Sequence, residues 1–194
     1  MKDFKLEAPT INEGEVLLDA TLTPLGWLSY ALTHKGLKEM MLMYKTVDLA
    51  LFHLASQKIH GRFSIREDLS AFLPLLEHWR NYFLLLLSDP SEELNHIQIP
   101  IDDTAWTEIE KNVYYSLRNV EPGQTMTYGE LAAAVGKPRA ARFIGNLMKK
   151  NPLPLVIPCH RVVGKNGRMC GFSGEGGIEL KKHLLEIEKK AMKH

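Results

Sequence analysis

A cysteine, a histidine and an arginine follow one another at Cys159, His160 and Arg161. A thiol has a pKa of roughly 8.5 and attacks only after it loses its proton, which a neighbouring imidazole can accept directly or through water. Pro154 and Pro158 flank the short apolar run before the cysteine and restrict the backbone that leads to it. A lone cysteine is more often an inert buried thiol, but this combination of neighbours predicts a nucleophile at Cys159.

The chain around this motif is basic. Residues 1–102 carry nine Lys and Arg against fourteen Asp and Glu, whereas residues 103–194 carry fifteen against nine, so the net charge of +1 hides an asymmetry. No acidic residue occurs between Leu131 and Gly174, a segment that contains Lys137, Arg139, Arg142, Lys149, Lys150, Arg161, Lys165 and Arg168. Such a segment is typical of a polyanion-binding surface, although a solvated basic surface explains the charge alone equally well.

Two short helices are expected to carry part of this basic segment. Thr127 and Glu130 form a capping-box pattern that opens the first helix, and Gly136 is a natural residue to end it. Pro138 suits the first turn of a second helix, which is expected to run to residues 151–152. Two short helices joined by a glycine turn predict a helix-turn-helix motif.

The second helix combines one long cation with small residues. Arg142, Gly145, Asn146 and Lys149 fall on one side of it at steps of three and four. Small residues such as Ala141 and Gly145 let a helix backbone approach a partner closely, and Arg142 is then the long side chain that can reach past the backbone. A plain amphipathic helix with a surface arginine is the alternative.

The first half of the chain predicts a sheet followed by a helix. Residues 16–22 and 27–32 alternate like strands around a hairpin-type turn, and residues 37–43 could form a third strand. Apolar residues recur at helical steps over residues 67–87, where Pro74 predicts a break or kink.

The second half is expected to be mostly helical. Residues 91–104 are typical of a linker, residues 106–117 carry a helical apolar stripe, and residues 155–157 suit a buried strand or extended segment. The expected class is α/β in the broad sense, more strictly α+β, with domains at residues 1–98 and 99–194.

The stretches TYGELAAAVGKPRAARFIGNLMKKN, NPLPLVI and PCHRVVG together resemble the O6-alkylguanine-DNA alkyltransferase family, the methylated-DNA–protein-cysteine methyltransferases. The resemblance covers residues 103–190 well and the first domain more loosely, through TPLGWLSYALTHKGLKEMML. It implies a ribonuclease-H-like N-terminal sheet-and-helix domain, followed by a winged-helix-like DNA-binding domain that contains the helix-turn-helix.

The resemblance also implies an activity, the direct reversal of DNA damage. The alkyl group of O6-alkylguanine, with O4-alkylthymine as a further candidate substrate, would pass irreversibly to Cys159 in a single turnover. His160 would act as the base and Glu188 would hold its imidazole, while Asn151 would brace the surrounding turn. Tyr128 would protonate N3 of the leaving guanine. No cofactor or metal is expected.

The implied partner is double-stranded DNA, bound through its minor groove with the damaged base flipped out. Arg142 would fill the space that the base vacates. Pro154, Phe172 and Ser173 are expected in the base pocket, with phenylalanine at position 172 where many family members have tyrosine. The residues expected to bind DNA are Arg142, Tyr128, Gly129, Lys137, Ala141, Gly145 and Lys165.

Composition suggests where the protein acts. The longest apolar run is far too short to span a bilayer, and the N-terminus has no apolar secretion signal. Cys159 and Cys170 are the only thiols and are expected to stay reduced. We expect a monomer without membrane partners in the cytoplasm, associated with the nucleoid, or in the nucleus if the cell is eukaryotic.

Three other functions are compatible with parts of the sequence. A non-catalytic alkyltransferase-like protein would bind damaged DNA, but such proteins lack the cysteine that this chain has at position 159. A cysteine hydrolase could use Cys159, His160 and Glu188 as a triad, but it leaves the basic helix-turn-helix unexplained. A helix-turn-helix regulator would not need Cys159.

Overall fold

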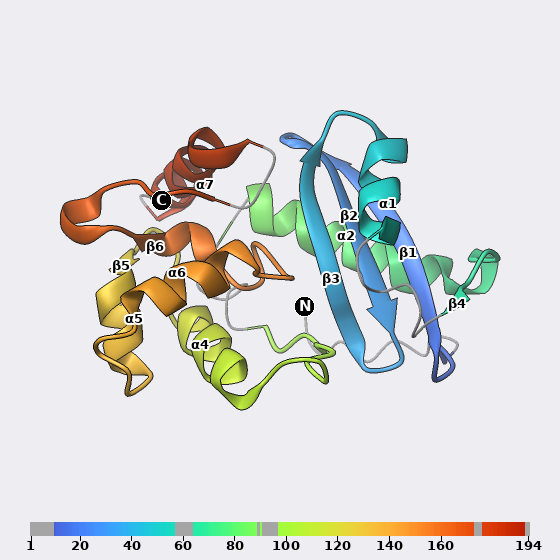
Figure 1. Ribbon diagram of the computed structural model, residues 1–194. Helices are drawn as coiled ribbons and strands as arrows, with labels where there is room; N and C mark the ends of the chain where they lie inside the picture. The colour runs from blue at the N-terminus through green and yellow to red at the C-terminus, as the bar shows by residue number, and fades with distance from the viewer. Residues whose placement is uncertain (1–9, 57–63, 89, 91–96, 173–175, 193–194) are drawn as a thin grey trace. The chain divides into compact units, whose positions relative to one another are not determined.

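The computed structural model describes residues 10–56, 64–88, 90, 97–172 and 176–192, and the chain divides into two compact units (Figure 1). The first comprises Met1–Leu85 with Ile97–Asp103, and the second comprises Leu86–His96 with Thr104–His194. The segment 97–103 joins the sheet unit because Leu37 hydrogen-bonds to both Pro100 and Asp102. The expected domains, residues 1–98 and 99–194, stay a prediction, while the expected mixture of a sheet and helices is confirmed.

The first unit is built on a four-stranded sheet in the order β3-β2-β1-β4. The strands β1 (Glu15–Thr23), β2 (Gly26–Thr33) and β3 (Gly36–Tyr44) are antiparallel, and β4 (Ser64–Ile65) runs parallel to β1. The three strands expected from sequence are therefore present. The turn before β3 requires glycine, because Gly36 has φ of +123° and a Cβ there would lie 2.3 Å from the carbonyl oxygen of Pro100.

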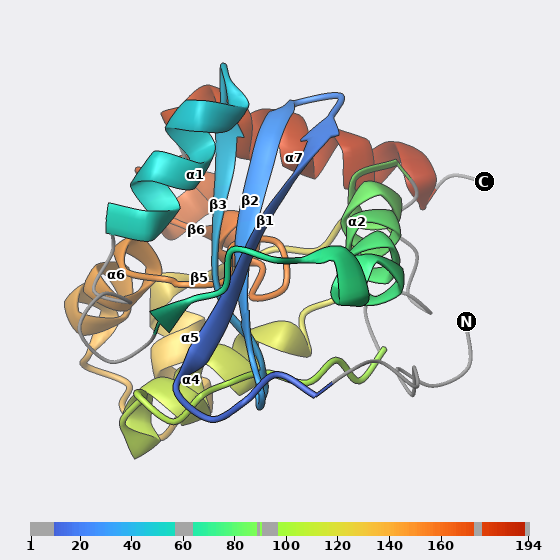
Figure 2. The same ribbon diagram turned by 90° about the vertical axis from the view of Figure 1, so that its right-hand side faces the viewer.

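Helices cover both faces of this sheet (Figure 2). Alternate residues of a strand face opposite sides, so Val16 and Ala31 pack with Leu54 of α1 (Val47–Ser56) on one face. The hydroxyl of Ser29 donates to the carbonyl oxygen of Ala50 at 2.9 Å and ties α1 to the sheet. Helix α1 was not expected from the sequence.

The other face packs against α2 (Leu73–Ser88), where the ring of Phe83 lies 4.9 Å from that of Tyr30. Tyr30 donates its hydroxyl to Asp19 at 2.5 Å, and Arg80 donates to both oxygens of Asp19 at 2.6 and 2.8 Å. The helix expected over residues 67–87 is interrupted next to Pro74, as predicted: a separate 3-10 turn covers Ser70–Phe72, and α2 begins at Leu73. Pro74 then lies in the first turn of α2, where a missing N–H costs little.

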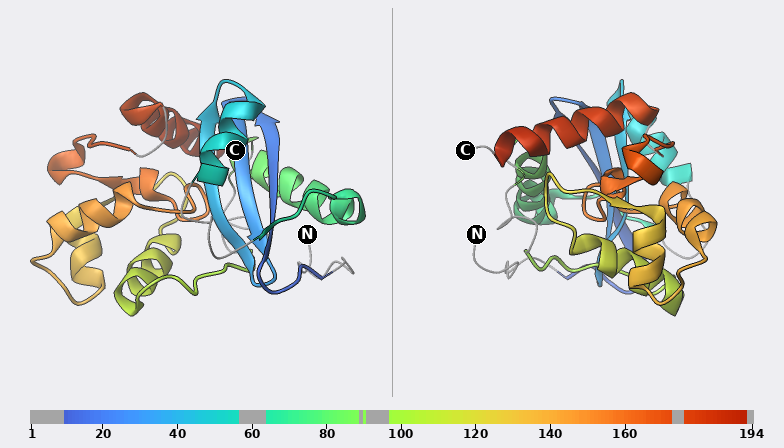
Figure 3. Two further views of the ribbon diagram at one scale, coloured as in Figure 1. Left: turned by 45° about the vertical axis from the view of Figure 1, so that its right-hand side comes forward. Right: turned by 90° about the vertical axis from the view of Figure 1, so that its left-hand side faces the viewer.

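The second unit is mostly helical, with α4 (Glu108–Arg118), α5 (Tyr128–Ala134), α6 (Ala141–Lys149) and α7 (Gly177–Ala191). A short parallel pair, β5 (Met126–Thr127) and β6 (Val162–Val163), joins two distant segments. Figure 3 shows α5 and α6, yellow to orange, packed as the expected helix-turn-helix pair. None of the described helices combines the length and the apolar character needed to cross a membrane.

The capping box that opens α5 is confirmed: Thr127 accepts from the N–H of Glu130 at 3.1 Å, and the Glu130 carboxylate accepts from the N–H of Thr127 at 2.6 Å. The expected start of α6 at Pro138 is wrong, because the helix begins at Ala141. Residues 137–140 form a turn closed by the N–H of Ala140, and proline favours the second position of such a turn.

The paired charges under α2 give a test of the first unit. Arg80→Met leaves the buried carboxylate of Asp19 without its cation, so we expect the free energy of unfolding to fall by about 1–3 kcal/mol. Arg66→Met removes the more exposed pair with Glu15 and should cost less than about 1 kcal/mol. Urea denaturation followed by circular dichroism measures the free energy of unfolding of both variants. Equal losses in the two variants would contradict a larger contribution from the buried pair.

Candidate active site and DNA-binding groove

The cysteine lies on a single 3-10 turn, Cys159–Arg161, that leads directly into β6. The N–H of Cys159 donates to Ile157 at 2.7 Å, and the N–H of Arg161 donates to Pro158 at 2.9 Å. Cys159 is only 2% exposed, and His160 is equally buried. Cys159, the expected nucleophile, and His160, its expected base, are therefore adjacent on one turn and buried in the interior of the unit.

Asn151 holds the loop that precedes this turn. Its side-chain amide donates to the carbonyl oxygen of Ile157 at 2.8 Å, and its Oδ1 accepts from the N–H of Leu153 at 3.0 Å. The strand expected at residues 155–157 is wrong, because Leu155 has a φ of 75°, which turns the backbone. Asn151 is thus placed to brace the turn, and its role in the chemistry stays a prediction.

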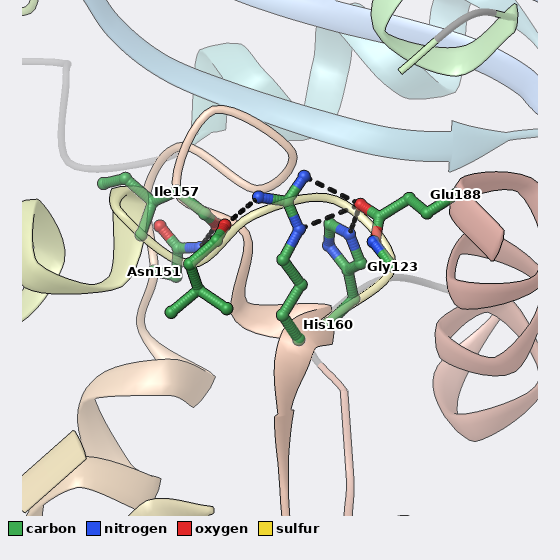
Figure 4. A network of polar contacts seen from close by, with 7 residues as sticks. Gly123, Asn151, Ile157, His160 and Glu188 are labelled. Atoms are coloured by element: carbon green, nitrogen blue, oxygen red, sulfur yellow. Dashed lines mark hydrogen bonds and ion pairs between the residues drawn. The ribbon is translucent and has the colours of Figure 1, made fainter. Parts of the chain in front are cut away.

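Glu188 of α7 is the centre of a buried polar network (Figure 4). One carboxylate oxygen accepts from His160 Nε2 at 2.6 Å and from Arg161 at 2.8 and 2.9 Å. The other accepts from the N–H of Gly123 at 3.0 Å. The contact expected between Glu188 and His160 is present, and Arg161 and Gly123 join it.

The network sets the protonation of its members. Burial raises the pKa of Glu188, but the charges and hydrogen bonds of His160 and Arg161 outweigh it and lower this pKa to about 2. Burial lowers the pKa of His160, against the opposing effect of Glu188. A neutral imidazole beside a carboxylate places its proton on Nε2, which leaves Nδ1 to accept a proton. No group in the described part of the chain hydrogen-bonds to Nδ1.

A groove of about 730 Å³ lies along the helix-turn-helix. The ring of Tyr128 packs against Gly145, where an added Cβ would lie 3.9 Å from it. Lysine and arginine side chains make the groove basic. The residues that line it are Thr127, Tyr128, Gly129, Ala141, Arg142, Gly145, Asn146, Lys149, Lys165, Cys170 and Gly171.

Most of the residues expected to bind DNA line this groove, but Lys137 is exposed outside it. Cys159 is buried and is not among the residues that line the groove. Of the expected base pocket, Pro154 is buried and Phe172 is partly buried, and neither is among the residues that line the groove. Ser173 lies outside the described residues.

Sequence reasoning placed Glu188 in the site but missed Lys181. Both are buried on the face of α7 that also carries Leu180, Leu184 and Leu185. A lysine on the apolar face of an amphipathic helix is the signal that could have found it. Arg161 had been noted only as a basic neighbour of the cysteine.

Comparison with known proteins agrees with this geometry. The family model for the DNA-binding domain of 6-O-methylguanine DNA methyltransferase matches residues 108–190. The methylated-DNA–protein-cysteine methyltransferase of Shigella flexneri is 38% identical over 132 residues, which cover 67% of this chain and 72% of that protein. The chain belongs to the methylated-DNA–protein-cysteine methyltransferase family.

Other members of the family match different portions of the chain. The methyltransferase of Methanosarcina acetivorans is 40% identical over 82 residues, so the match spans 42% of this chain and about half, 51%, of that relative. The solved Mycobacterium tuberculosis O6-methylguanine methyltransferase superposes with a TM-score of 0.64 at 28% sequence identity. The match covers 91% of the present chain and 94% of the M. tuberculosis chain. The M. tuberculosis protein OGT solved in complex with DNA has a TM-score of 0.65 at 27% identity, with 90% and 94% covered.

The buried carboxylate predicts a particular acid sensitivity. The pKa of Glu188 falls from 4.5 to about 2 on folding, so its contribution to stability is present above about pH 4.5 and is lost as the pH falls toward 2. The lowered pKa of His160 also reduces stability as the pH falls. Below about pH 6.5 the imidazole takes up a proton in the unfolded chain more readily than in the folded one, and this favours unfolding.

We expect Glu188→Gln to lower stability at neutral pH and to remove a loss of about 3 kcal/mol that the unaltered protein suffers between about pH 5 and pH 2. Thermal melting over this range measures both effects. Glu186→Gln is the matched control, since Glu186 is exposed on the same helix. An unchanged pH profile in Glu188→Gln would show that this carboxylate is not held ionised by its partners.

Proposed function

We propose that this protein repairs DNA by transferring the alkyl group of O6-alkylguanine irreversibly to Sγ of its own Cys159, once per molecule. The observation that carries the proposal is the hydrogen bond of 2.6 Å from His160 to Glu188, on the turn that begins with the buried Cys159. A binding protein without chemistry has no need of a thiol beside a base that is oriented in this way. Family membership supports the same reaction.

The residues account for each proton and bond. The thiol of Cys159 gives its proton to Nδ1 of His160, directly or through water, and Glu188 stabilises the imidazolium that forms. The thiolate attacks the alkyl carbon, the S–C bond forms, and the C–O bond breaks with its electrons passing to the guanine. Tyr128 then gives a proton to guanine N3, because a neutral base leaves more readily than its anion. No step regenerates the thiol, so the reaction ends after one turnover.

DNA binding is assigned to the groove along α5 and α6. Arg142, Lys149 and Lys165 give the groove positive charge. Ala141 and Gly145 are small residues, so the DNA backbone can come close to the backbone of α6. These features suit the minor groove of a duplex, with Arg142 entering the stack. The DNA complex of the M. tuberculosis protein supports DNA as the partner. We further propose a monomer that acts in the compartment where the DNA lies.

The burial of the nucleophile adds a requirement. Because Cys159 is only 2% exposed and is not among the residues that line the groove, a base that stays stacked in a duplex cannot reach its sulfur. The damaged nucleotide must leave the helix, and we propose that it enters beside Tyr128. The pKa of this tyrosine is raised by burial and by negative charge at Cys170 and Cys159, so its hydroxyl carries a proton near neutral pH.

The transfer itself can be read by peptide mass spectrometry. After incubation with duplex DNA that contains O6-methylguanine, we expect one added methyl group on the peptide that holds Cys159. Cys159→Ala should bind the same DNA without repairing it, which separates binding from chemistry. Methyl found on Cys170 alone, or on no residue, would contradict the assignment.

The proposed entry of Arg142 into the base stack can be separated from the nonspecific attraction of a positive charge to DNA. We expect Arg142→Ala to slow repair of duplex DNA by about tenfold or more, while reaction with free O6-benzylguanine changes little. Arg139→Ala is the matched control, because Arg139 is exposed near the start of the same helix and does not line the groove. Equal losses on both substrates, or equal losses in both variants, would refute a role for Arg142 in the stack. Binding should also weaken with salt.

A further inference from the structure

A second charged residue of α7, Lys181, is completely buried at 0% exposure. Its ammonium group donates to the carbonyl oxygen of Val162, three residues after the nucleophile, and lies 3.5 Å from the carbonyl oxygen of Cys170. It also lies 5.9 Å from the centre of the Tyr128 ring. Lys181 thus touches the strand that leaves the catalytic turn, the edge of the groove and the expected proton donor.

The buried charges of this unit do not balance while the thiol is neutral. Among the described residues of the second unit, the buried charged side chains are Arg161, Lys181 and Glu188. The carboxylate of Glu188 is engaged by Arg161 and His160, and Lys181 forms no ion pair within the described part of the chain. One positive charge therefore stays uncompensated, which is costly in a buried site. Ionisation of Cys159 would neutralise it.

The titratable groups around the nucleophile respond to this charge consistently. Burial lowers the pKa of Lys181, and negative charge at Cys159 and Cys170 opposes that shift. Burial lowers the pKa of His160, and the positive charges of Arg161 and Lys181 add to the effect. The pKa values of Tyr114 and Tyr128 are raised, mainly by burial, so both stay neutral beside the thiol. Lys181 therefore favours an anionic sulfur next to a neutral imidazole.

We infer that Lys181 is a positioning residue whose buried ammonium group stabilises the thiolate of Cys159. It acts through the sulfur and need not touch the DNA. The inference rests on the proposed function, because it takes Cys159 as the nucleophile. Its carbonyl contacts could instead make Lys181 a purely structural anchor, and the experiment has to separate a charge from a hydrogen-bond donor.

Two neutral variants make this separation. Lys181→Met removes the charge and the donors, whereas Lys181→Gln removes the charge and keeps N–H donors for the carbonyl groups. The thiol pKa is read from the ultraviolet absorbance of the thiolate as a function of pH, with the trace of Cys159→Ser in each background subtracted. Lys182→Met is the matched control, because Lys182 is exposed and paired with Glu179 one turn away.

We expect both neutral variants to raise the pKa of Cys159 by about one unit or more, and Lys182→Met to leave it unchanged. Methyl transfer near neutral pH should then fall about tenfold in both, and should recover at alkaline pH as the thiolate fraction returns. Recovery by Lys181→Gln at neutral pH would show that only the hydrogen bonds matter. An unchanged thiol pKa, or a loss of rate that is equal at every pH, would also overturn the inference.

The titration needs no DNA, so the outcomes remain distinguishable. If the unaltered protein transfers methyl to Cys159 but the variants keep its pKa, the inference about Lys181 fails alone. If the unaltered protein transfers no methyl, the proposed function fails whatever the titration shows. Circular dichroism and thermal melting identify folded variants, and either neutral variant is sufficient to contradict the role of the charge.

Discussion

The carboxylate of Glu188 accepts hydrogen bonds from two segments of the second unit that are far apart in the sequence from each other and from α7. It joins α7 to the turn that carries Cys159 through His160 and Arg161, and to the loop before β5 through Gly123. A buried carboxylate is tolerable only when such donors surround it. The same contacts that keep it ionised also orient the imidazole. Local folding and the protonation of the candidate site therefore depend on one group.

Helix α7 brings two opposite charges to the catalytic segment. Lys181 and Glu188 are seven residues apart, close to two helical turns, so they lie on the same face about 10 Å apart along the axis. The carboxylate contacts the imidazole and the ammonium group contacts the backbone after it. In the proposed mechanism, a cation that stabilises the thiolate and a carboxylate that stabilises the imidazolium would both favour movement of a proton from thiol to imidazole.

The sequence predicted best what is encoded by close neighbours. The capping box of Thr127 and Glu130 spans three residues, and strands β1 to β3 follow from alternation and tight turns. Contacts between distant segments leave no comparable pattern in the sequence. Arg161, for example, donates to the same Glu188 oxygen as His160, although Arg161 and Glu188 are 27 residues apart. The left-handed backbone at Leu155 was also hidden. A β-branched, apolar neighbourhood favours a strand, whereas hydrogen bonds from the Asn151 side chain to Leu153 and Ile157 hold this segment as a turn.

Burial of Cys159 has two opposing effects on its chemistry. Removal from water disfavours the thiolate and so makes the sulfur a poorer nucleophile. The same burial excludes solvent and strengthens each electrostatic contact in the site, so a neutral imidazole and a cation nearby can favour the anion more than they would at a surface. A sulfur that is only 2% exposed is out of reach of a base in an intact duplex. In the proposed reaction, selectivity for an extruded base can therefore come from the burial of the sulfur as much as from contacts to the base itself.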